Sequence, residues 1–129
     1  MKIAVLIARI LLGLLFLVAG AMKFYFAATT GGPPPPPMPG LAGQFTDIMF
    51  KSHYIMVVCA FEVIAGVLLL VNRYVRLALV IVAALLVNIL TYHATMYPAG
   101  IVPGLIAVVL WFVVAWPQRA RFAAFFSAV

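Results

Sequence analysis

The sequence predicts an all-α integral membrane protein, a four-helix bundle with both the N- and the C-terminus in the cytoplasm. Of its 129 residues, 68% are hydrophobic and only 8% are charged, whereas soluble domains average about 45–50% apolar and about 25% charged residues. A soluble fold of this length has too little interior to bury so much apolar surface. The apolar residues also form four segments close to the roughly 20-residue length that a helix needs to cross a bilayer.

The four expected spans occupy residues 3–26, 54–71, 75–94 and 101–116, within a single transmembrane domain covering residues 1–129. Each segment is apolar on all sides, as is typical of membrane-spanning helices. The second and third spans are joined by VNRYVR, which is short enough only for a helical hairpin. The third and fourth are joined by TMYPAG, in which a proline and a glycine end one helix and begin the next.

The connection between the first two spans, residues 27–53, is much longer and contains GGPPPPPMPG. Five consecutive prolines favour a polyproline II rod of about 15 Å, which would serve as a rigid external spacer or as a docking segment for a partner. The following GQFTDIMFKSHY places Phe45, Ile48 and Met49 at near-helical spacing, and Asp47 four residues before Lys51. We therefore expect a short interfacial helix on the outer membrane surface.

The basic and aromatic residues predict the orientation of the chain in the membrane and the structure of its C-terminal tail. Placing the N-terminus in the cytoplasm leaves only Lys23 and Lys51 outside and collects the other basic residues inside, namely Lys2, Arg9, Arg73, Arg76, Arg119 and Arg121. The tail, residues 117–129, combines two arginines with three phenylalanines after Trp116, and this predicts a cytoplasmic interfacial helix. Because the basic residues are scattered singly, the net charge of +6 does not predict nucleic-acid binding.

Polar residues inside the spans are the candidate functional residues. Glu62, one of only two acidic residues, lies in the middle of VVCAFEVIAGVLLL. Ionisable groups inside a span cost about 2.5–3.5 kcal/mol on insertion scales and mark functional sites by default. The rise of 1.5 Å per helical residue places Glu62 roughly 12 Å below the outer surface. We expect an intramembrane polar cluster in the outer half of the membrane, made of Lys23, Glu62, Asn88, Tyr92 and His93.

Such a cluster is compatible with three roles: a polar network that fixes helix register, a proton-handling or ligand-binding site, or a contact with a partner subunit. Small residues on the same helices, Gly13, Gly20 and Gly66, are expected to allow close helix packing. The single cysteine, Cys59, excludes an intramolecular disulfide and a dithiol motif. Two histidines 40 residues apart, His53 and His93, form no recognisable metal site, so no metal is expected.

Three segments, GLLFLVAGAMKF, FEVIAGVLLLVNR and NILTYH, resemble the motifs of the DoxX-like family of small four-helix integral membrane proteins. The residues that carry the resemblance lie on the first, second and third expected spans or directly after the second, and are Gly13, Phe16, Gly20, Lys23, Glu62, Gly66, Arg73, Asn88 and His93. The long proline-rich loop departs from the short loop expected of the family. The resemblance covers most of the chain, and it implies a four-helix bundle without an agreed catalytic residue.

The resemblance also implies an association with respiratory or thiol redox chemistry, since some relatives are membrane subunits of quinone-linked oxidoreductases. We therefore expect an accessory integral-membrane subunit of a larger quinone-linked redox complex, which contributes anchoring and helix–helix contacts. Two alternatives stay open. One is a structural or assembly factor without a redox role. The other is a stand-alone proton-handling enzyme or carrier that uses Lys23, Glu62 and His93.

The expected partners are the lipid bilayer and either other protein subunits or further copies of the chain. No cofactor is expected to be held by this chain alone, although a quinone or lipid is expected at its surface. The expected location is the cell membrane, as a multi-pass protein of the bacterial inner membrane.

Overall fold

A computed structural model of the chain describes residues 1–127, and within that range it contains helices but no β-strand. The final two residues of the expected tail, 128 and 129, lie outside the described range. The six α-helices are α1 (Lys2–Thr29), α2 (Gly40–Lys51), α3 (Tyr54–Leu70), α4 (Val75–Met96), α5 (Val102–Ala115) and α6 (Arg119–Phe125). Short 3₁₀ turns, Pro98–Gly100 and Trp116–Gln118, precede α5 and α6. The predicted all-α fold class is confirmed.

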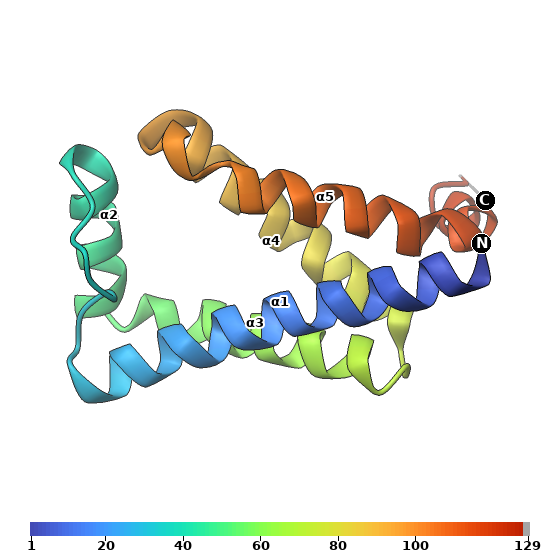
Figure 1. Cartoon of the computed structure of the whole chain (residues 1–129), viewed down its shortest axis with the longest axis horizontal. Coiled ribbons are helices and arrows are strands. Elements are labelled where there is room, and N and C mark those ends of the chain that lie inside the picture. Colours follow the sequence, from blue (N-terminus) through green and yellow to red (C-terminus); the bar gives the residue numbers. More distant parts are fainter. Residues whose placement is uncertain (128–129) are drawn as a thin grey trace.

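Four long helices pack side by side and α2 lies across one end of them (Figure 1). Helices α1 and α3 run antiparallel and share the most extensive contact. Helix α4 packs on α3, α5 packs on α4, and α5 also returns to contact α1, so each of the four has two neighbours. The N-terminus, the turn between α3 and α4 and the C-terminal helix all lie at the end opposite α2.

Three helical segments are long and apolar enough to cross a membrane: α1, α4 and the continuous stretch Val102–Phe125. Helix α3 meets the same length criterion only together with α2, and the two are bent by 87°. By itself α3 has 17 residues, which corresponds to about 26 Å and is the lower limit for a transmembrane helix. The chain is therefore a multi-pass membrane protein with three, or up to four, membrane-spanning helices.

Apolar side chains occupy both the interior and the outside of the bundle. The interior contains Leu12 and Phe16 of α1, Leu69 of α3 and Leu79 of α4, each no more than 1% exposed. Large apolar side chains also cover the outer faces of the same helices, for example at Val18, Ile64, Val87 and Val109. In water such a surface would drive aggregation, whereas in a bilayer it faces acyl chains of similar polarity.

The turns show how the chain reverses direction. Between α2 and α3, His53 has a φ of 62°, and between α3 and α4, Asn72 has a φ of 56°. These values lie in the left-handed region, which asparagine and histidine enter more readily than most residues. The Arg73 amide donates to the Leu68 carbonyl and closes the end of α3.

The proline-rich segment does not form the straight rod that five prolines predict. The chain bends at Pro35 and Pro36, on its way from the end of α1 to α2, which lies across the bundle end (Figure 1). The short helix predicted after the prolines is present as α2, and Lys51 Nζ lies 2.6 Å from Asp47 Oδ2 on it.

Candidate functional site

An ion pair joins α1 to α3 within the membrane-spanning part of the chain. Lys23 Nζ lies 2.6 Å from Glu62 Oε1. The Glu62 side chain is 1% exposed and the Lys23 side chain is 32% exposed. Among residues 1–127, Glu62 is the only charged or polar residue in the buried class, and its second oxygen, Oε2, has no hydrogen-bond partner. The glutamate is therefore buried in the protein, and the lysine that pairs with it is partly exposed.

Glycines bring the two helices close enough for this pair to form. A Cβ added to Gly20 would lie 2.9 Å from the Cβ of Glu62, and a Cβ added to Gly66 would lie 2.7 Å from the Leu17 amide nitrogen and 2.8 Å from the Gly13 carbonyl oxygen. The backbones of α1 and α3 are thus in direct contact, as in other membrane helix pairs packed through small residues. The predicted packing glycines and the predicted lysine and glutamate lie in one interface.

Tyr92 lies in a different place, where α4 meets α2 and the proline-rich segment, and the neighbouring His93 contacts Tyr97 just beyond the end of α4. The Tyr92 hydroxyl donates to Met38 Sδ at 2.8 Å and lies 3.2 Å from Thr46 Oγ1. The Tyr92 ring lies 5.7 Å from that of Phe45 and 5.0 Å from that of His93. These contacts attach α2 to the end of α4. Within the described chain, no hydrogen bond or ion pair links this group to the Lys23–Glu62 pair.

Asn88 faces away from both groups. Its side chain is exposed, and Nδ2 donates to the Ala84 carbonyl one turn earlier at 2.9 Å. The five residues expected to form one cluster therefore divide into an ion pair between α1 and α3, a contact between α2 and α4, and an exposed amide. Sequence position fixes the depth of a residue along a helix, but the rotation of each helix about its own axis is set by packing.

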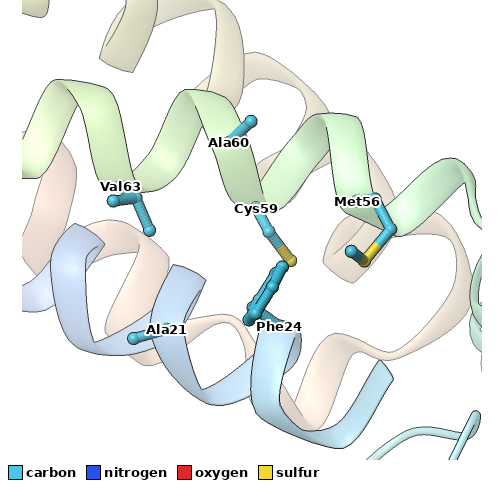
Figure 2. Close-up of a pocket in the computed structure, with 6 residues that line it drawn as sticks. All are labelled: Ala21, Phe24, Met56, Cys59, Ala60 and Val63. Atoms are coloured by element: carbon cyan, nitrogen blue, oxygen red, sulfur yellow. The ribbon is translucent and has the colours of Figure 1, made fainter. Parts of the chain in front are cut away.

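A shallow apolar groove of about 400 Å³ lies beside the ion pair, between α1 and α3 (Figure 2). It is lined by Ala21, Phe24, Met56, Cys59, Ala60 and Val63. Figure 2 shows Phe24 and Cys59 directed toward one another from the two helices. Cys59 and Val63 lie three residues before and one residue after Glu62, and Phe24 directly follows Lys23. The groove is therefore lined by apolar residues that neighbour both members of the ion pair in the sequence.

Sequence reasoning missed the structural role of Arg9, which it used only as a topology signal. Arg9 Nη1 donates to the Leu69 carbonyl and, at 3.3 Å, to the Leu70 carbonyl. These carbonyls belong to the last turn of α3, where the regular helical partner four residues on is missing. The Leu69 carbonyl also accepts from the Asn72 amide at 3.3 Å. A second missed bond runs from Trp111 Nε1 to the Leu79 carbonyl at 2.8 Å and joins α5 to α4.

The described residues contain no group of three or more metal-ligating side chains.

The antiparallel apolar helices, the lipid-facing outer surface and the buried ion pair define a small multi-pass helical membrane protein. The chain belongs to the DoxX family, since the family model described as DoxX matches residues 4–94. This range covers α2, α3 and nearly all of α1 and α4, and it contains the ion pair, the packing glycines and the groove. No curated protein and no solved structure showed a significant match.

Proposed function

We propose that the chain is an accessory subunit of a larger, quinone-linked redox complex in the bacterial inner membrane. In this proposal other subunits carry the redox centres, and this chain anchors them and offers the groove between α1 and α3 to the apolar tail of a quinone or lipid. The observation that carries the proposal is that groove, which is apolar throughout its lining and lies beside the buried ion pair.

The groove has properties suited to an apolar tail. Its volume of about 400 Å³ falls within the range of pockets that bind small molecules. It lies between two membrane-spanning helices, so a tail could enter from the bilayer without crossing water. Close glycine packing and the Lys23–Glu62 bond hold its two walls together.

Lys23 is the polar residue best placed to bind the head of such a molecule. An ammonium group has three N–H donors, and one of them is used by Glu62. Because the side chain is 32% exposed, the other donors have room to reach a carbonyl or phosphate oxygen. Stand-alone proton handling has less support, because it needs His93. This residue lies on α4, away from Lys23 and Glu62, and its Nδ1 is 3.2 Å from the Tyr97 carbonyl oxygen.

Purification from native membranes in a gentle detergent tests this proposal. We expect the chain to elute with larger subunits that carry a redox cofactor, and the complex to reduce or oxidise an added quinone. Ala60→Phe should fill the groove and raise the KM for the quinone at least about fivefold, since a misfitting group of this size costs about 1–3 kcal/mol.

The matched control is Val67→Phe, about two turns further along α3, because Val67 is 41% exposed and does not line the groove. It should leave the KM unchanged. A stable complex without quinone activity would instead favour the structural or assembly role, and a chain that elutes alone would contradict the subunit proposal.

We further propose that the end of the bundle opposite α2 is the cytoplasmic end. The N-terminus, the α3–α4 turn and the C-terminal helix lie together there (Figure 1), and these segments carry Lys2, Arg73, Arg76, Arg119 and Arg121. Short cytoplasmic loops are enriched in lysine and arginine. An alkaline phosphatase domain inserted between residues 30 and 39 should therefore be active, and green fluorescent protein at the same position should be dark. The reverse pattern would contradict this orientation.

A further inference from the structure

The outer face of α4 carries a stripe of small and polar side chains that no other part of the described chain covers. It consists of Ala84, Asn88, Thr91 and Thr95, all of them exposed. Their spacing of four, three and four residues places them along one side of the helix. The buried residues of α4, namely Ala78, Leu79, Val82 and Leu86, lie on the opposite side.

Asn88 is the residue in this stripe whose hydrogen bonds are least satisfied. At 1.5 Å per residue it lies about 20 Å from the start of α4 and about 12 Å from its end, which places it inside the hydrocarbon core. One N–H of its amide donates to the Ala84 carbonyl. Within residues 1–127 the Oδ1 atom accepts no hydrogen bond and the second N–H has no acceptor. Lipid tails supply neither partner.

The two threonines differ from Asn88 because their hydroxyl protons are already used. Thr91 Oγ1 donates to the Val87 carbonyl and Thr95 Oγ1 donates to the Thr91 carbonyl, each at 2.7 Å. Together with Ala84 they form a surface of small side chains on both sides of the amide. Small residues allow a second helix to approach closely, and amides form bonds between membrane helices.

We propose that this stripe is the contact between two copies of the chain, related by a twofold axis along the membrane normal. Two copies with the same orientation place Asn88 opposite Asn88. Because an amide carries both donors and an acceptor, the two side chains can then satisfy each other with reciprocal N–H···O bonds, and a twofold contact is self-complementary in this way. A different subunit would need its own donor and acceptor groups at the same depth. The contact is separate from the groove between α1 and α3.

Disulfide crosslinking in native membranes tests the geometry. Thr91→Cys should give a crosslinked dimer under mild oxidation, and mass spectrometry should find only this chain in it. The control is Val109→Cys, a position on α5 that is 62% exposed and lies outside the stripe. The natural Cys59 is 1% exposed and is present in both variants. No crosslink above the control, or a crosslink to a different polypeptide, would overturn the proposal.

A dilution series in liposomes tests the amide itself, with energy transfer between labelled copies as the signal. Asn88→Leu should raise the dissociation constant of the dimer about 5- to 30-fold, the range expected for one bond between membrane helices. Asn88→Gln, which keeps an amide, should retain most of the affinity. Since Asn88 is exposed, neither change disturbs the interior, and circular dichroism verifies the fold. An unchanged dissociation constant for Asn88→Leu would overturn the role of the amide, whatever the outcome for the quinone groove.

Discussion

Replacing Lys23 with methionine is expected to lower the free energy of unfolding by about 3–5 kcal/mol, the loss typical of removing one partner of a buried ion pair. The Glu62 side chain is 1% exposed, and among residues 1–127 Lys23 is the only group that donates to it. Without the ammonium group, the carboxylate would be a buried charge without compensation. Methionine keeps a long unbranched side chain, so the change removes the charge without opening a cavity. Unfolding by sodium dodecyl sulfate in bicelles measures this loss.

Glu62→Gln is the control, and we expect a loss of only about 1 kcal/mol, close to the value of one hydrogen bond. Glutamine has nearly the same shape as glutamate and leaves no buried charge. The Lys23 ammonium that remains is on a side chain 32% exposed, and it can extend toward the membrane surface. Equal losses for Lys23→Met and Glu62→Gln would contradict the difference in burial between the two residues.

Gly66→Ala is expected to cost about 2–3 kcal/mol, at the upper end of the range for an overpacked interior. The added Cβ would lie 2.7 Å from the Leu17 nitrogen and 2.8 Å from the Gly13 oxygen. Both atoms belong to the backbone of α1, so they cannot move aside as the end of a side chain can. The two helices must separate, and the Lys23–Glu62 bond must lengthen with them. The same bicelle assay measures the effect.

Gly104→Ala on α5 is a matched control in the same protein. Its added Cβ would meet Leu90 Cδ2 at 3.3 Å and Ile89 Cγ2 at 3.4 Å. Both are side-chain atoms at longer distances than at Gly66, and Leu90 Cδ2 is the end of a flexible side chain that can shift by a few tenths of an ångström. We expect it to cost less than about 1 kcal/mol. A Gly66→Ala protein as stable as the Gly104→Ala protein would show that α1 and α3 are not in backbone contact.

The all-helical membrane fold could be predicted from the sequence because it depends on composition and length. An excess of apolar residues in four segments is compatible with few folds other than a helical membrane bundle. Pro98 and Gly100 mark the turn between the third and fourth segments. The proline-rich segment was predicted less well. Local preference favours a rod, but the chain bends at Pro35 and Pro36. Met38, near the end of this segment, accepts a hydrogen bond from Tyr92 on α4, and local preference does not include such a tertiary contact.

The candidate site could be predicted only in part. Depth along the helices is enough to suggest that Lys23 and Glu62 meet, since one ends the first span and the other lies on the antiparallel second span. Depth says nothing about rotation, and this is why Asn88 was expected in one cluster with Lys23 and Glu62 but is exposed on another face. The Arg9 bonds to the end of α3 depend on a long-range approach between helices, which leaves no local pattern in the sequence.

A double-mutant cycle on Lys23→Met and Glu62→Gln, measured by unfolding in bicelles, tests most directly whether the ion pair holds α1 against α3 inside the membrane. The burial of Glu62 predicts that the effects of the two substitutions are not additive. The double variant should be about 2 kcal/mol more stable than the sum of the single losses implies, within the range known for residues in contact. Additivity to within about 0.5 kcal/mol, the behaviour of distant sites, would contradict it.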